Sequence, residues 1–330
     1  MRGSQVRRRE LIAFLGGSVL AWPLCALAQQ PALPVIGFLS SASVRGPVPN
    51  AFHNGLNEAG YFSDQNVIIE TLQAEGYYDK LPGLAADLVG RQVKLIVAAG
   101  GLVSARAAIA TTRTIPILFI AGFDPVKLGI VPSFSRPGGN ATGISIYTTE
   151  LLGKRLSLLL ELKPRVERLA LLVNASNVVS EFEVKDMEAV AAAAGLRLIV
   201  VGASAKIGIE AAFASAVDQN ADALLVSADP FFSTRRRQIV ALAAHYRLPA
   251  AYPWREYVEA GGLMSYGPTL MEAYHQIGLY AGRILKGEKP GDLPVQLPRK
   301  FELAVNLGTA KTLDLEVPRI TFFRADHLID

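Results

Sequence analysis

The side chains with the right chemistry to bind a small ligand follow the ends of short apolar segments along this chain. Serine hydroxyls can hold a carboxylate, a carboxylate side chain can hold an ammonium group, and an aromatic ring can stack on an apolar or cationic group. Glycines at such positions let a ligand approach the backbone closely. The candidate ligand-binding residues are Ser40, Ser41, Ser43, Gly100, Gly101, Asp124, Asn177, Ser180, Asp229, Trp254, Glu256 and Tyr266.

Several of these candidates also have a purely structural interpretation. Ser43 and Ser180 could be helix N-caps, and Asp124, which precedes a proline, could shape a turn. The arginine run at 235–237 is interpreted as the solvated face of a helix. No single residue decides between these interpretations, but the recurrence of candidates after successive apolar segments favours a binding site.

Sequence motifs for catalysis, metal binding and nucleotide binding are missing. The chain has no phosphate-binding loop, no G-x-G-x-x-G after its first apolar segment and no G-x-S-x-G. The four histidines are scattered without metal-ligand spacing: His53, His245, His275 and His327. We therefore expect no metal, no cofactor and no catalytic residue, and we predict that the protein is not an enzyme.

The apolar segments predict the scaffold that brings these candidates together. Continuous apolar strands separated by amphipathic helices are typical of parallel sheets covered on both faces. The carboxyl ends of parallel strands meet at one edge, where open α/β sheets bind ligands. The predicted strands are 35–39, 67–72, 95–99, 117–121 and 142–146, followed by 169–173, 198–201, 223–227 and 250–252.

Two sheets explain this series better than one. The alternation of strands and helices is interrupted by Gly- and Pro-rich segments at 136–140, 261–268 and 289–294. Three interruptions suit a chain that crosses between two lobes more than once. The sequence therefore predicts a two-lobed α/β fold.

The N-terminal residues 1–28 read as an export signal. Arg7, Arg8 and Arg9 precede an apolar run, and the A-L-A that ends at Ala28 is a typical cleavage site. The arginines resemble the twin-arginine type of signal. A retained membrane anchor is one alternative, and lipidation at Cys25 is another, although the large residues before Cys25 disfavour it.

Composition excludes several classes of protein. With 330 residues, 51% hydrophobic and 19% charged, the chain is too apolar for disorder, and one cysteine excludes a disulfide scaffold. The leader carries four Arg and one Glu, so cleavage after Ala28 would lower the net charge from +4 to +1. A nearly neutral mature chain disfavours a nucleic-acid partner.

Several segments resemble a known family. The most specific are G-F-D-P-V at 122–126 and R-P-G-G-N-A-T-G at 136–143, with further matches at 257–267, 292–296 and 301–311. Over residues 33–330 the chain is similar to the substrate-binding proteins of ABC transporters, a group of periplasmic components with tryptophan-binding relatives.

This resemblance implies a type I periplasmic-binding fold with three hinge crossovers and a ligand between the lobes. We expect one lobe from 33–147 plus 268–295 and the other from 148–267 plus 296–330. The implied function is the periplasmic receptor of a bacterial ABC importer. Its partners would be a small carboxylate-bearing solute (an amino acid, such as an aromatic one, or a related organic acid) and an inner-membrane permease, and it would act as a monomer. The alternatives are a secreted α/β enzyme and a separate ligand-sensor subunit.

Overall fold

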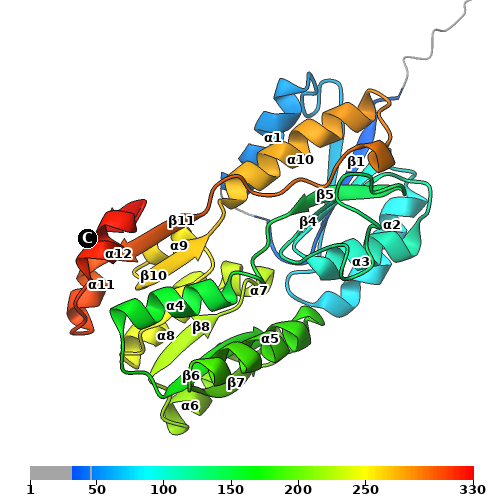
Figure 1. Ribbon diagram of the computed structural model, residues 1–330. Coiled ribbons are helices and arrows are strands. Elements are labelled where there is room, and N and C mark those ends of the chain that lie inside the picture. Colours follow the sequence, from blue (N-terminus) through cyan, green and yellow to red (C-terminus); the bar gives the residue numbers. More distant parts are fainter. Residues whose placement is uncertain (1–31, 45–46) are drawn as a thin grey trace, which may run out of the picture. The chain divides into compact units, whose positions relative to one another are not determined.

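The computed structural model describes residues 32–44 and 47–330 (Figure 1). Leu33–Asp330 form one compact unit. The predicted export signal, its cleavage site and Cys25 lie outside the described residues. Within the described ranges, no helix combines the length and the apolar character needed to cross a membrane.

The first sheet has five parallel strands in the order β2-β1-β3-β4-β5. Each strand matches a predicted strand to within one residue at either end, because each is a short, mostly buried apolar run. Their bounds are β1 Val35–Ser40, β2 Ile68–Gln73, β3 Leu95–Ala99, β4 Ile117–Ala121 and β5 Ala141–Ser145.

Side chains of the central strands alternate between two hydrophobic cores, one on each face of the sheet. Leu118 and Ile120 of β4 belong to one core, whereas Ile117 and Phe119 belong to the other. Burial on both faces explains why these strands are continuous apolar runs in the sequence. The helices of this lobe are α1 Pro47–Glu58, α2 Leu81–Gly90, α3 Leu102–Thr111 and α10 Leu270–Leu285, with short 3-10 turns η1 Tyr78–Lys80 and η2 Pro290–Asp292.

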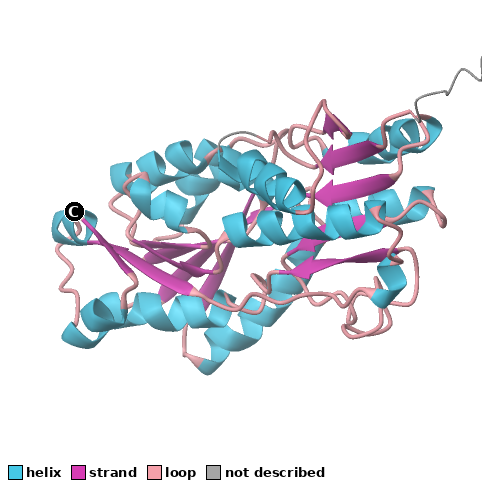
Figure 2. Cartoon of the chain, turned by 90° about the horizontal axis from the view of Figure 1, so that it is seen from above, coloured by secondary structure: helices cyan, strands magenta, loops and turns pink. Residues whose placement is uncertain are grey.

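The second sheet has seven strands in the order β12-β11-β10-β9-β8-β6-β7 (Figure 2). All neighbours are parallel except β10 and β11, which run antiparallel. The bounds are β6 Arg168–Asn174, β7 Arg197–Ala203, β8 Ala223–Val226, β9 Ala250–Tyr252, β10 Met264–Gly267, β11 Glu302–Asn306 and β12 His327–Ile329.

Prediction of this second sheet was incomplete. Only β6 to β9 were expected, and a purely parallel sheet was predicted for each lobe. The strands that were missed are short, and β11 enters antiparallel because the chain returns to this sheet from the other lobe. The helices here are α4 Leu152–Leu162, α5 Val179–Ala193, α6 Ile209–Asp218, α7 Pro230–Thr234, α8 Arg236–His245, α9 Arg255–Glu259, α11 Leu307–Thr312 and α12 Arg319–Arg324.

The chain passes between the sheets three times: after β5, after β10 and after η2. Two of these crossings are hydrogen-bonded to each other. The N–H of Ser145 donates to the carbonyl of Gln296, and the N–H of Gln296 donates to the carbonyl of Gly143, both at 3.0 Å. The two-lobed α/β fold is confirmed, whereas the lobe boundaries remain predictions.

Helices α1 and α10 pack unusually closely (Figure 1). A Cβ atom added at Gly55 of α1 would overlap the backbone oxygen of His275, and one added at Gly278 of α10 would overlap that of Phe52. These glycines let the two helix backbones touch. The contact holds α10, which follows the second crossing, against the first sheet.

Candidate functional site

A cavity of about 930 Å³ lies where the carboxyl ends of the two sheets face each other. Ser40 at the end of β1 and Gly100 after β3 line it from the first sheet. Ala228 after β8 and Trp254 after β9 line it from the second sheet. The cavity has the size of a small-molecule site and lies at the edge where parallel sheets bind ligands.

The first-sheet wall is polar. Ser40, Ser43, Gly100 and Gly101 line the cavity, as predicted for ligand-binding residues. Gly100 and Gly101 have φ values of +84° and +87°, which favour glycine, and they lead directly into α3. The wall thus combines hydroxyls with the N-terminus of a helix, a combination that suits a carboxylate.

Ser41 lies behind this wall instead of in it. Its side chain is fully buried, and its hydroxyl donates to the carbonyl of Gly100 at 2.7 Å. Ser41 therefore holds the glycine turn in place, and it is absent from the cavity lining.

Asp229 also lies behind the wall, in a buried network that joins the two lobes. Its Oδ1 accepts hydrogen bonds from the Tyr78 hydroxyl (2.8 Å), Asn174 Nδ2 (2.9 Å) and the Phe231 N–H (2.9 Å), and its Oδ2 accepts one from Asn177 Nδ2 (2.8 Å). Burial raises the pKa of Asp229, while these donors oppose the rise. With four donors already bound, the carboxylate is not free to receive an ammonium group.

Four other candidates lie outside the cavity lining, and one of them, Asn177, donates to Asp229 as described above. Asp124 caps its own turn, since its Oδ1 accepts from the N–H groups of Val126 (2.8 Å) and Lys127 (3.1 Å). The Ser180 hydroxyl donates to the Asn174 carbonyl at 2.8 Å. Tyr266 stacks on Phe301, with ring centroids 6.1 Å apart. The turn interpretation of Asp124 describes this structure better than ligand binding.

Aromatic and apolar side chains form much of the remaining wall. Trp254 and Glu256, both predicted, line the cavity together with Phe231 and Tyr257. Leu270 and Tyr274 of α10 also line it and were not predicted. Their contribution depends on the return of α10 to the first sheet, which no local pattern reveals.

The arginine run at 235–237 lies at the start of α8 and is largely exposed, as predicted for a solvated helix face, but it also borders the cavity. All three arginines line the cavity, although Arg235 and Arg237 are also exposed to solvent. Arg236 is half-buried, and its Nη1 donates to the carbonyl of Ser233 at 3.1 Å. The run begins α8 directly after the short helix α7, and this turn brings the arginines to the carboxyl edge of the sheet.

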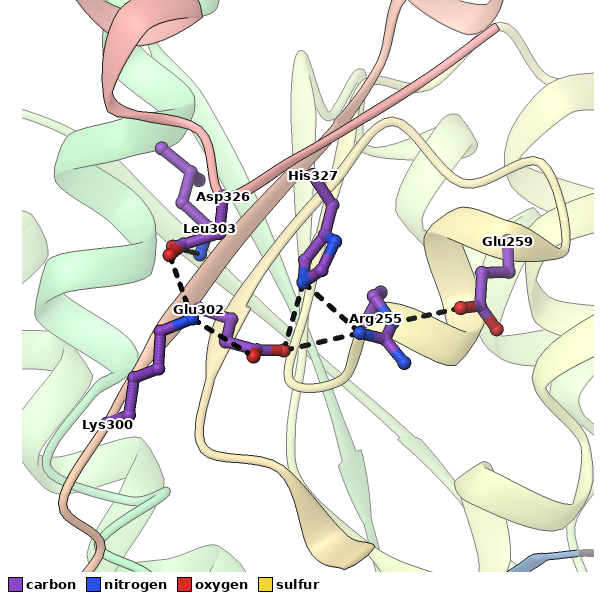
Figure 3. A network of polar contacts seen from close by, with 7 residues as sticks. All are labelled: Arg255, Glu259, Lys300, Glu302, Leu303, Asp326 and His327. Atoms are coloured by element: carbon purple, nitrogen blue, oxygen red, sulfur yellow. Dashed lines mark hydrogen bonds and ion pairs between the residues drawn. The ribbon is translucent and has the colours of Figure 1, made fainter.

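Arg255, between Trp254 and Glu256, ties this wall to the last strands of the second sheet (Figure 3). Its guanidinium pairs with Glu259 at 2.9 Å and with Glu302 of β11 at 3.5 Å, and Glu302 Oε2 lies 3.3 Å from His327 Nε2. His327 therefore has a structural role. No group of three His, Cys, Asp or Glu side chains in the described ranges could hold a metal ion.

A second buried polar group supports the hinge side of the cavity. Arg155 of α4 is fully buried and donates to the carbonyls of Thr148, which lines the cavity, and of Val226. Burial raises the pKa of Glu183 on α5 to about 8, and the charge of Arg155 opposes this rise. Burial lowers the pKa of Arg155 itself to about 10.

We expect Glu183 to make the folding stability depend on pH. Its pKa is higher in the folded protein than in the unfolded chain, so the folded state holds the extra proton between about pH 4.5 and 8. Ionisation of Glu183 should therefore lower the free energy of unfolding as the pH rises through this window, by up to a few kcal/mol. Glu183→Gln cannot ionise, so its stability relative to the native protein should increase from pH 5 to pH 8.5.

Urea unfolding of both proteins at the two pH values measures this difference. Titration of other groups is common to both proteins and cancels. A difference in stability that stays constant between pH 5 and 8.5 would show that Glu183 ionises with an ordinary pKa.

Comparison with known proteins gives consistent matches over nearly the whole described chain. The family model described as "ABC transporter substrate binding protein" matches residues 34–329. A tyrosine-binding protein of Clostridioides difficile strain R20291 is 28% identical over 279 residues, which cover 84% of this chain and 80% of the relative.

Two solved structures have similar folds. A conserved domain protein from Vibrio cholerae O1 biovar eltor is 23% identical, with a TM-score of 0.81, covering 89% of this chain and 99% of that one. A Streptococcus pneumoniae ABC domain in complex with L-Trp is 24% identical, with a TM-score of 0.79, covering 90% and 100%.

Proposed function

Because this chain belongs to the ABC transporter substrate-binding protein family, we propose that it receives one small carboxylate-bearing solute in the cavity and delivers it to an ABC importer. The observation that carries this proposal is the cavity itself, which is lined by the carboxyl ends of both sheets. A ligand there contacts both lobes, between which the chain crosses three times. Binding therefore favours the closed arrangement, which the transporter can recognise.

The chemistry of the walls supports an aromatic or similarly apolar carboxylate. The Ser43 hydroxyl and the N–H groups at the start of α3 offer donors to a carboxylate, whereas the Ser40 hydroxyl already donates to the Ala42 carbonyl at 2.8 Å. Phe231, Trp254 and Tyr274 offer rings to the apolar part. Two of the similar proteins are described as a tyrosine-binding protein and as an ABC domain in complex with L-Trp, and both amino acids are aromatic carboxylates.

Contacts between the lobes would favour closure in addition to the ligand. The buried Tyr78 hydroxyl donates to Asp229, and the exposed Lys206 Nζ lies 2.8 Å from Asp79 Oδ2. The exposed pair contributes little by itself, whereas the buried bond is lost when the lobes separate.

Export completes the proposal. A signal over residues 1–28, cleaved near Ala28, would deliver the mature protein to the periplasm, where it would meet an inner-membrane permease as a monomer. We infer that it acts by binding and not by catalysis.

Trp254 provides a direct test, since the other tryptophan, Trp22, belongs to the predicted signal. We expect L-phenylalanine, phenylpyruvate or benzoate to change the emission of Trp254, which is buried in the cavity wall. A ligand at 100 times its dissociation constant should also add about 2.7 kcal/mol to the stability.

The Trp254→Phe variant is the control, since it should lose the emission change but keep a thermal shift. If neither signal changes with any aromatic or aliphatic carboxylate, the proposed ligand class is wrong. If a stabilising compound is converted to product, the protein is an enzyme.

A further inference from the structure

Tyr257 presents an unusual polar group to the cavity. The residue lines the cavity and is fully buried. Its hydroxyl lies near the Ser233 side chain but makes no hydrogen bond of ordinary geometry among the residues that the structure describes. A buried hydroxyl without a partner costs about as much free energy as a lost hydrogen bond. Such a hydroxyl indicates that an atom of the bound ligand forms the missing hydrogen bond.

The Tyr257 hydroxyl is fixed in position and ready to donate. Its ring stacks on Tyr252, with centroids 4.8 Å apart and planes 16° apart. Burial raises the pKa of Tyr257 well above its usual value, so the phenol keeps its proton at neutral pH. An acceptor atom is therefore the complementary ligand group.

Arg236 supplies a positive charge to the same wall. Its Nη1 donates to the Ser233 carbonyl, and no ion pair within 4 Å joins its guanidinium to a carboxylate in the part of the chain that the structure describes. The remaining N–H groups of a half-buried guanidinium can bind an acidic group in bidentate fashion. Arg236 and Tyr257 thus provide a cation and a neutral donor on one wall.

The charges of the other lining residues agree with an acidic ligand. Arg235, Arg236 and Arg237 outnumber Glu75 and Glu256, and the Ser40 wall on the first sheet carries hydroxyls and glycines. Asp229, seven residues before Arg236, is already bound by four donors and lies outside the lining. A zwitterionic ligand whose single carboxylate binds the first-sheet wall would bring no negative charge to Arg235, Arg236 and Arg237.

We propose that Arg236 and the Tyr257 hydroxyl form a second acid-binding site in the cavity, so that the receptor selects solutes with two acidic groups separated by an apolar or aromatic segment. One acidic group binds the first-sheet wall at Ser43 and the start of α3, and the other binds Arg236 and Tyr257. This inference rests on the proposed function, because it concerns the ligand of the same cavity.

Calorimetric titration with two matched probes tests the proposal on the full mature chain. We expect 1,4-phenylenediacetate to bind about 10- to 100-fold more tightly than phenylacetate, which lacks the second carboxylate. Arg236→Gln should remove this preference by weakening the diacid alone. Tyr257→Phe, which keeps the ring stacked on Tyr252, should weaken the diacid by about 3- to 10-fold.

Arg165→Gln is the control, since Arg165 is exposed and lies outside the cavity lining. It should leave diacid affinity within about threefold of the native value. Thermal midpoints of all variants, measured without ligand, show whether each is folded.

The outcomes separate the two proposals. Equal affinity for both probes, or equal effects of Arg236→Gln and Arg165→Gln, would overturn the second acid-binding site and leave the receptor function intact. Binding of L-phenylalanine in preference to the diacid would do the same. Failure of every mono- and dicarboxylate to bind would overturn the proposed function together with this inference.

Discussion

Asp229→Ala is expected to lower both the stability of the protein and its affinity for ligand. The change leaves the Tyr78 hydroxyl and the side-chain amides of Asn174 and Asn177 without their acceptor, and it removes the cap from the Phe231 N–H. A buried donor that loses its acceptor costs about 1–3 kcal/mol, so the loss of several donor contacts at once should cost at least about 3 kcal/mol. Most of this loss concerns contacts within the second lobe, so urea unfolding should detect it without ligand.

The closure component can be measured separately. Tyr78→Phe removes only the hydroxyl that donates across the lobes and keeps the acceptor of Asn174 and Asn177 in place. We therefore expect it to weaken ligand binding by about fivefold, equivalent to about 1 kcal/mol. Binding is measured by titration and stability by urea unfolding of the same samples.

Asp124→Ala is the matched control. Asp124 is also an aspartate after a strand, but it caps a half-exposed turn outside the cavity lining. We expect a stability loss of about 1 kcal/mol or less and unchanged affinity. Equal effects of the two substitutions would contradict the distinction that the structure draws between them.

Gly55→Ala should have the second large effect. The added Cβ would overlap the backbone oxygen of His275, and backbone atoms cannot move aside as a flexible side chain can. Forcing α1 and α10 apart should cost about 3 kcal/mol or more. Because Val48 of α1 and Tyr274 of α10 both line the cavity, affinity should fall as well.

Gly83→Ala provides the comparison in urea unfolding. Gly83 lies in α2, and a Cβ atom there would meet nothing within 4 Å. Replacing a helical glycine with alanine in open space should stabilise the protein by about 0.5–1 kcal/mol. If both alanine variants unfold at the same urea concentration, the helices do not pack as closely as described.

The sequence predicted the first sheet well because its central strands β1, β3 and β4 are apolar runs buried on both faces. The second sheet was harder to predict, since β10 and β11 follow interruptions in the alternation of strands and helices and β11 reverses direction after a crossing. Apolar periodicity carries no information on which distant segment a strand pairs with. That pairing is decided by the return of the chain, as at β11.

The site was predicted in part. The rule that ligands bind at the carboxyl edge of a parallel sheet identified Ser40, Gly100 and Trp254 in the lining. It could not distinguish a residue in the wall from one behind it, so Asp229 and Ser41 were included as well. It also could not locate Tyr274, which reaches the cavity on a helix far along the chain, or assign the arginines to the cavity.

The close contact between α1 and α10 has a consequence for how the protein folds. It joins residues 47–58 to residues 270–285, so the first lobe is complete only after nearly the entire chain has been synthesised. The second lobe likewise needs β11 and β12 from the last thirty residues. Such non-local pairing is typical of slow folding, because loop-closure entropy is lost before the contacts form. Neither lobe corresponds to a continuous stretch of sequence, and the nascent chain stays incomplete until its C-terminal strands are available.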